Sequence, residues 1–185
     1  MEHTIIIAGS GGQGILFLGR LMAYATMLEG KEVTWMPSYG AEMRGGTANC
    51  TVVISDEMIG SPVVRNPCIL VVMNDASYSR FVCKLLPGGT LLYDSSFIKR
   101  TDHREDVKAL GVPASKLSST LNSTKLANMV LMGAIISSTD VLSLDSVLKA
   151  LDDITPENRK NSIDLNRQLI RRGFDIIENK KSNPS

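Results

Sequence analysis

The sequence has few aromatic residues and almost no net charge. Its 185 residues include four Phe, four Tyr and one Trp, and 20 basic residues nearly balance 19 acidic ones, for a formal charge of +1. A balanced charge offers no electrostatic attraction to a nucleic acid or an anionic membrane, and no segment interleaves aromatic with basic residues to stack bases. We therefore expect no nucleic acid and no membrane as a partner.

Long apolar stretches are missing as well. The longest runs, residues 68–73 and 129–136, fall well short of the roughly 20 residues that a membrane-spanning helix needs. The first three residues, Met1-Glu2-His3, contain no basic region, and the apolar run over residues 4–8 leads into glycines rather than into a cleavage site. These features predict a cytoplasmic protein.

Metal-binding side chains are scarce. Cys50, Cys68 and Cys83 are odd in number and widely spaced, no Cys-x-x-Cys pair occurs, and His3 and His103 are the only histidines. The sequence therefore predicts no metal site and no iron–sulfur cluster on this chain. Any redox chemistry must come from an organic cofactor or from a partner chain.

Short β-branched runs alternate with helical patterns along the chain. The expected strands are residues 4–8, 31–36, 47–55, 69–73 and 90–93, and the expected helices are 15–28, 76–86, 121–138, 145–152 and 157–178. This order predicts an α/β fold with a single doubly wound, mainly parallel, Rossmann-like sheet flanked by helices. Residues 47–55 are a candidate antiparallel edge strand, residues 1–178 form one domain, and residues 179–185 form a frayed polar tail.

A glycine-rich loop follows the first expected strand. Gly9, Gly11 and Gly14 fit the pattern Gly-x-Gly-x-x-Gly between a strand and a helix. Glycines allow positive φ and close approach of a phosphate, and free amides at a helix start attract anions. The loop therefore predicts a cofactor-binding segment, whose residues are Gly9, Ser10, Gly11, Gly12, Gln13 and Gly14. A tight turn with close helix packing explains the same glycines.

Two familiar nucleotide sites do not fit this loop. A dinucleotide site needs an acidic residue about 20 positions further on to hold a ribose hydroxyl, but residues 34–38 read Thr-Trp-Met-Pro-Ser. A Walker site needs Lys-Ser or Lys-Thr at the end of the loop, and neither occurs. An ordinary NAD or ATP site is therefore not expected.

A second loop, residues 37–46, is unusually rich in functional residue types. It follows the second expected strand and should lie beside the glycine loop at the carboxyl edge of the sheet, where α/β folds bind ligands. Arg44 can clamp a carboxylate or phosphate, or pair with Glu42 to stiffen the loop. The candidate residues of this active-site or interface loop are Ser38, Tyr39, Gly40, Glu42, Arg44, Gly45 and Gly46.

The two loops at this separation, with Gly19 after the first, resemble those of the gamma subunit of 2-oxoacid:ferredoxin (acceptor) oxidoreductases. This family acts on pyruvate, 2-oxoglutarate, branched-chain 2-oxoacids or indolepyruvate, and the resemblance runs over most of the chain. Weaker family-like features, which packing explains equally well, are Asn128, Gly133, Asn166 and Gly173.

The resemblance implies a division of labour among chains. Partner subunits of alpha, beta and delta type would hold thiamine diphosphate and iron–sulfur clusters and pass electrons to ferredoxin. This chain would have no catalytic residue of its own and no activity alone, while the complex converts a 2-oxoacid, by overall resemblance 2-oxoglutarate, to an acyl-CoA. On this view the amides of residues 9–14 cradle the pyrophosphate of coenzyme A, and residues 38–46 face the thiamine-binding chains.

Two other functions compete with this one. A free-standing nucleotide-binding enzyme would need its own acid or base, for which Asp75 and Asp94 are available, although both positions are typical of helix caps and turns. Alternatively, a purely structural assembly subunit would use both loops only to contact its partners.

Overall fold

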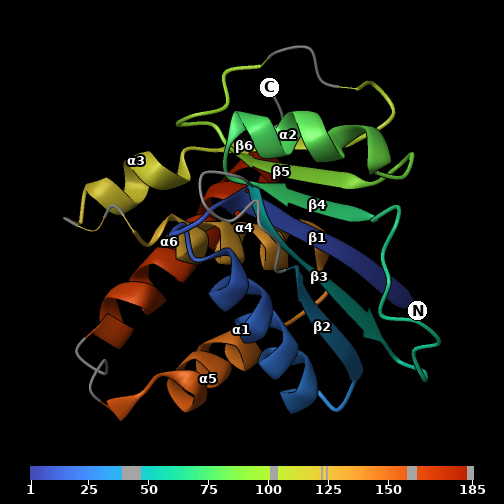
Figure 1. The fold of residues 1–185 in the computed structure, drawn as a ribbon. Coiled ribbons are helices and arrows are strands. Elements are labelled where there is room, and N and C mark those ends of the chain that lie inside the picture. The colour runs from blue at the N-terminus through green and yellow to red at the C-terminus, as the bar shows by residue number, and fades with distance from the viewer. Residues whose placement is uncertain (39–46, 101–103, 122, 124, 158–161, 183–185) are drawn as a thin grey trace.

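A single six-stranded sheet forms the centre of the computed structural model, which describes residues 1–38, 47–100, 104–121, 123, 125–157 and 162–182 (Figure 1). The strands, which follow the order β2-β3-β1-β4-β5-β6 across the sheet, are β1 (Glu2–Ser10), β2 (Glu32–Ser38), β3 (Thr47–Ser55), β4 (Ile69–Val72), β5 (Thr90–Asp94) and β6 (Lys108–Val112). The helices are α1 (Ile15–Leu28), α2 (Asp75–Phe81), the 3-10 helix η2 (Val82–Lys84), α3 (Ala114–Ser119), α4 (Ala127–Thr139), α5 (Leu144–Ile154) and α6 (Ile163–Ser182).

Strand pairing confirms the predicted mainly parallel α/β sheet. β4 pairs in parallel with β1 and β5, and β5 pairs in parallel with β6. β3 is antiparallel to both β1 and β2, as expected for residues 47–55. Its expected place at the edge is wrong, because β3 lies between β1 and β2 and leaves β2 outermost. Because the connection over residues 39–46 is short, β3 returns antiparallel to β2 and pairs beside it. β3 thereby occupies the position next to β1.

The sheet buries both of its faces. Because successive side chains of a strand point to opposite faces, Ile5 and Ile7 join the core beneath α1, α4, α5 and α6, whereas Ile6 and Ala8 join the core beneath α2. Figure 1 shows the same arrangement, with α2 on one side of the strands and α1 and α5 on the other. Helices therefore cover both faces of the sheet, as expected of a doubly wound fold, but more of them lie on one face than on the other.

The crossing of α4 and α6 depends on two glycines. Every residue of α4 from Ala127 to Ser138 is buried, as expected for a core helix. A Cβ atom added to Gly133 would lie 1.8 Å from the carbonyl oxygen of Ile170, and one added to Gly173 would lie 1.9 Å from that of Val130. The helices therefore touch backbone to backbone, which confirms a packing role for both glycines.

Several boundaries differ from the expected ones. Sequence patterns missed β6 and α3, and the helix expected from residue 121 begins at Ala127. The helix expected over residues 76–86 is α2 followed by η2, which ends at Lys84. α6 continues to Ser182, so residues 179–182 are helical rather than frayed. Among the described residues, no helix is both long enough and apolar enough to cross a membrane.

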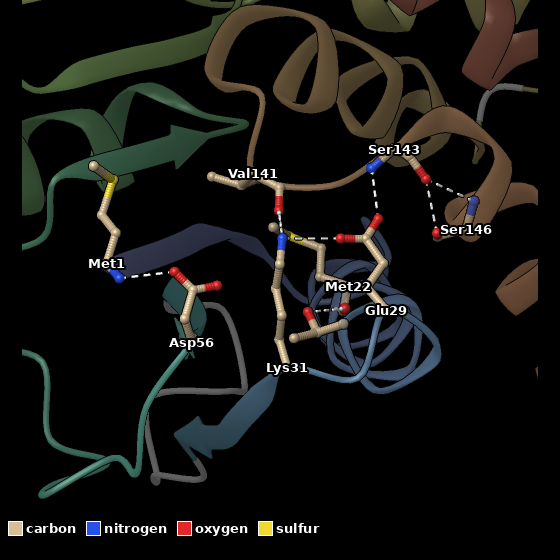
Figure 2. Close-up of polar contacts among 9 residues, drawn as sticks. Met1, Met22, Glu29, Lys31, Asp56, Val141, Ser143 and Ser146 are labelled. Carbon is tan, nitrogen blue, oxygen red and sulfur yellow. Dashed lines mark hydrogen bonds and ion pairs between the residues drawn. The ribbon is translucent and has the colours of Figure 1, made fainter.

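A polar cluster joins the end of α1 to the connection between α4 and α5 (Figure 2). Lys31 Nζ lies 2.9 Å from Glu29 Oε2 and donates to the carbonyl oxygen of Val141 over 3.3 Å. The backbone N–H of Ser143 donates to Glu29 Oε1 over 2.7 Å, and the Ser143 hydroxyl caps α5 by accepting from the N–H of Ser146. One carboxylate thus links elements that are far apart in the sequence.

Candidate functional site

The glycine loop lies at the carboxyl end of β1, where strand order reverses. The chain leaves β1 through α1 toward β2 on one side, and β4 continues the sheet on the other side. Gly12 and Gly14 adopt positive φ angles of 88° and 75°, which lets the chain turn sharply from β1 into α1. In open α/β sheets this switch point is the usual place for a ligand.

The side chain of Gln13 folds back and closes the loop on itself. Its Oε1 accepts from the N–H of Ser10 over 2.6 Å, and its Nε2 donates to the carbonyl oxygen of Met73 over 3.4 Å. The N–H of Gln13 in turn donates to the carbonyl oxygen of Ser10 over 3.2 Å. Ser10 and Gln13 therefore use these groups to hold the loop against the end of β4.

Two further carboxamides brace the loop from neighbouring elements. Asn74 Nδ2 donates to Ser10 Oγ over 2.6 Å, while Asn74 Oδ1 caps α2 by accepting from the N–H of Ser77 over 2.7 Å. Asn128, at the start of α4, donates from Nδ2 to the carbonyl oxygen of Gly14 over 3.2 Å. Sequence reasoning noted Asn128 only as a family-like feature and missed Asn74, whose signal is its position between a strand and a helix.

The loop glycines divide into two packed and two exposed residues. A Cβ atom at Gly9 would lie 2.6 Å from Gln13 Oε1, and one at Gly14 would lie 2.3 Å from Asn128 Nδ2, so both positions exclude larger residues. Gly11 and Gly12 are exposed at the tip of the loop. Close packing thus explains Gly9 and Gly14, and the tip is the part of the loop that can meet a ligand.

A cleft of about 220 Å³ opens beside this tip. Gly12 and Gln13 line one side of it, Ser115 and Ser119 line another, and Phe97 is 61% exposed at its border. Lys125 is the one charged residue among the described residues that line it. The positive charge of Lys125 favours an anionic group here.

The two candidate carboxylates are occupied by structural contacts. Arg100 binds Asp75 through two hydrogen bonds of 2.7 and 3.0 Å, and this hydrogen bonding lowers the pKa of Asp75. Asp94 is fully buried, and its carboxylate accepts from the N–H of Ser96 and from both the N–H and the hydroxyl of Ser115 at the start of α3. This capping and turn-forming role of Asp94 removes support for a free-standing acid–base enzyme.

Both ends of the second loop reach the edge of the sheet that carries the glycine loop. Ser38 ends β2 opposite Asn49, and Thr47 begins β3 opposite Ser10. Ser38 and Asn49 line an open hollow of about 370 Å³ at this edge. The other candidate residues lie outside the described residues: Tyr39, Gly40, Glu42, Arg44, Gly45 and Gly46.

The cysteines are free thiols, and the first lies deep in the core. Burial raises the pKa of Cys50 to about 12, which keeps it protonated and unreactive. A Cβ atom at Gly19 would lie 2.6 Å from Cys50 Sγ, so Gly19 allows α1 to pack closely on β3. Within the described parts of the chain, no three His, Cys, Asp or Glu residues are grouped so that they could hold a metal ion.

The fold and the loop define an α/β domain that presents a glycine loop and an adjoining cleft, lined in part by Lys125, at the switch point of its sheet. Comparison with known proteins then identifies the family. The model of the family described as pyruvate ferredoxin/flavodoxin oxidoreductase matches residues 4–176, and the chain belongs to this family.

Some relatives of this chain are much longer than it is, and others have about the same length. Ketoisovalerate oxidoreductase subunit VorA of Methanothermobacter thermautotrophicus is 36% identical over 173 residues, which cover 93% of this chain and 36% of that protein. The chain therefore spans about a third of the VorA relatives. The 2-oxoglutarate synthase subunit KorC of Methanocaldococcus jannaschii is 32% identical over 181 residues, which cover 96% of this chain and 95% of that protein.

Solved structures share the whole fold. The gamma subunit of a keto/oxoacid ferredoxin oxidoreductase from Geobacter sulfurreducens superposes with a TM-score of 0.85 at 26% identity, covering 97% of this chain and 98% of that chain. A 2-oxoglutarate:ferredoxin oxidoreductase from Magnetococcus marinus gives a TM-score of 0.88 at 24% identity, covering 96% of this chain and 31% of that chain. The second likeness concerns the fold alone.

Proposed function

We propose that this chain is the gamma subunit of a thiamine diphosphate-dependent 2-oxoacid:ferredoxin oxidoreductase complex. The observation that carries the proposal is the end-to-end match to KorC subunits, which covers 95% of the Methanocaldococcus jannaschii protein. In this role the chain works with alpha-, beta- and delta-type subunits that hold thiamine diphosphate and iron–sulfur clusters. The complex oxidatively decarboxylates a 2-oxoacid, forms an acyl-CoA and passes electrons to ferredoxin.

We infer that the exposed tip of the glycine loop contacts coenzyme A. The residues fit a pyrophosphate, because Gly11 and Gly12 are exposed and Lys125 lines the adjoining cleft. When bound, coenzyme A supplies the thiol that accepts the acyl group. The part of the chain in this step is to hold the phosphates, and Gln13, Asn74 and Asn128 keep the loop in place for that purpose.

We further propose 2-oxoglutarate as the substrate of the complex. KorC, named a 2-oxoglutarate synthase subunit, matches this chain over its own full length, whereas VorA, named a ketoisovalerate oxidoreductase subunit, matches over a third of its length. Branched-chain 2-oxoacids are thus the main competing substrates. The second loop, with Ser38 at its described end, is assigned to contact with the thiamine-binding chains.

Isolation of the native complex from the source organism under anaerobic conditions tests this function. We expect the chain to copurify with larger subunits whose absorbance shows iron–sulfur clusters, in a cytoplasmic fraction. A panel of pyruvate, 2-oxoglutarate, ketoisovalerate and indolepyruvate should give the fastest coenzyme A-dependent reduction of ferredoxin with 2-oxoglutarate. Oxidation of a 2-oxoacid by the isolated chain, or a solitary native chain, would refute the subunit role. A different preferred substrate would refute only the assignment of 2-oxoglutarate.

A further inference from the structure

A second, smaller pocket adjoins the glycine loop and lies between the first turn of α1, the start of α4 and the described residues that follow α5 and precede α6. Its volume is about 180 Å³. The residues that matter for its chemistry are Phe17, Leu126, Asn128, Thr155, Pro156 and Asn166. Phe17 also lines the hollow beside Gly11 and Gly12, so the pocket adjoins the glycine loop.

Two buried asparagines in this pocket have unused acceptors. Asn128 is 3% exposed and Asn166 is 6% exposed, and the Oδ1 atom of each is buried without a hydrogen-bond partner among the described residues. The orientation of the Asn128 amide is fixed, because its Nδ2 donates to the carbonyl oxygen of Gly14. Unmet buried acceptors destabilise a fold and are rare in native proteins, so two in one pocket favour a hydrogen-bond donor supplied from outside the chain.

Packing of α4 against α6 does not account for the free Oδ1 acceptors of these asparagines. The close contact between α4 and α6 is made at Gly133 and Gly173, where backbone meets backbone. The hydroxyl of Thr155 already donates to the carbonyl oxygen of Leu151 over 2.6 Å, so it too can offer only an acceptor to an occupant. Asn128, Asn166 and Thr155 therefore present acceptors to the pocket, which favours an occupant with a hydrogen-bond donor.

The rest of the lining selects the kind of donor. Among the described residues that line the pocket none has a charged side chain, and burial of an unpaired cation would be costly. Phe17, Leu126 and Pro156 supply apolar surface suited to a flat group. An asparagine carboxamide pairs well with a group that places an N–H donor beside an acceptor, as it does with the N6 and N7 edge of adenine.

We propose that this pocket binds a neutral, planar group with an N–H donor beside an acceptor, which is the chemistry shared by a carboxamide and an aminopurine. The occupant contacts Asn128 and Asn166 with its polar edge and Phe17 with its face. Because Asn128 also holds Gly14, the occupied pocket stiffens the glycine loop. The proposal concerns the isolated chain and does not require the assignment of the chain to an oxidoreductase complex.

Side-chain amide NMR on the full 185-residue chain tests the proposal with matched probes. Adenosine is compared with purine riboside, which lacks the amino group, and benzamide is compared with acetophenone, which lacks the N–H donor. We expect saturable shifts of the Asn128 and Asn166 amide signals with adenosine, with benzamide or with both, and at least roughly tenfold weaker binding of the matched probe without the donor. Response to adenosine alone identifies an aminopurine site, and response to benzamide alone identifies a carboxamide site.

Substitution distinguishes this pocket from nonspecific binding. Asn166→Leu removes a buried acceptor that has no partner, so the fold should keep its thermal stability while probe affinity falls about tenfold or more. Asn179→Leu, an exposed position on the same helix, should bind as the native chain does. If Asn166→Leu does not fold, Phe17→Leu serves instead and should also weaken binding. Failure of both probes, equal binding of probes with and without the donor, or unchanged affinity in the pocket variant would overturn the proposal.

Discussion

At the scale of single residues, the glycines of the loop serve different purposes although the sequence motif treats them alike. Gly9 and Gly14 leave no space for a side chain, while Gly12 has open space but a φ of 88°. Gly11 is exposed, and it is not among the described glycines with positive φ. Packing or backbone conformation thus accounts for Gly9, Gly12 and Gly14.

Substitution of Gly14 should separate the conformational cost from the steric cost. Gly14→Ala places a Cβ at a φ of 75° and 2.3 Å from Asn128 Nδ2, so we expect a loss of about 2–4 kcal/mol in unfolding free energy. Gly30→Ala is the matched control, because Gly30 has a φ of 71° with nothing within 4 Å, and it should lose only about 1 kcal/mol. Urea denaturation measures both variants, and equal losses would contradict a steric role for Asn128.

The sequence predicted the position of this loop but not how it is held. The strand, glycines and helix are adjacent in the chain, so local patterns suffice to find them. Gln13 contacts Met73, and Asn128 contacts Gly14, across separations of 60 and 114 residues. Such contacts depend on the packing of α4 and β4 around the loop, and no local pattern reports them.

At the scale of elements, α4 and α6 cross with their backbones in close contact. A Cβ at Gly173 would meet the backbone of Val130, which cannot move without moving α4. Gly173→Ala should therefore destabilise the fold by about 3 kcal/mol or more, measured by thermal and urea unfolding. Gly60→Ala, at a position with nothing within 4 Å, should be nearly neutral. A stable Gly173→Ala variant would show that the two helices can separate at little cost.

The polar cluster around Glu29 should make stability depend on pH (Figure 2). Burial raises the pKa of Glu29, but hydrogen bonds from the N–H of Ser143 and from Lys31 outweigh it, and the pKa lies below its ordinary value of 4.5. Its contribution is therefore complete above the unfolded pKa and is lost as pH falls through the lower folded pKa. Glu29→Gln should cost about 1–2 kcal/mol at pH 7 and progressively less below pH 4.5.

Urea denaturation between pH 3 and pH 7 measures this difference. Glu32→Gln provides the control, because Glu32 is exposed on the edge strand β2. We expect its stability to follow that of the native chain across the range. A gap between the native chain and Glu29→Gln that stays constant with pH would contradict the assigned role of the carboxylate.

Elements with a strong apolar pattern were predicted well, and short ones were not. α1 was predicted with its observed bounds, because apolar residues recur at helical spacing between two glycine-containing turns. β6 and α3 were missed, because Lys108–Val112 and Ala114–Ser119 are too short for a clear period. Their stability comes from parallel pairing with β5 and from the hydrogen bonds that Asp94 accepts from Ser115.

At the scale of the whole molecule, one edge of the sheet collects the glycine loop, the ends of the second loop and the cleft beside Lys125. Alternating strands and helices predicted this shared edge, because the carboxyl ends of parallel strands lie together. The order of the strands could not be predicted in the same way. An antiparallel strand can pair at an edge or inside the sheet, and the choice of β3 for the inner position depends on its pairing with both β1 and β2.

A substitution at the exposed tip of the loop tests whether this edge of the sheet takes part in the reaction of the whole complex. Gly11→Val adds a side chain at an exposed position of the tip, so we expect the chain to fold and assemble. If the tip holds coenzyme A, the apparent KM for coenzyme A should rise about tenfold or more, while the KM for the 2-oxoacid stays near its native value. Gly60→Val, in open space away from this edge, is the matched control. An unchanged KM for coenzyme A in an intact complex would contradict the cradle, and loss of assembly would instead favour a structural role for the loop.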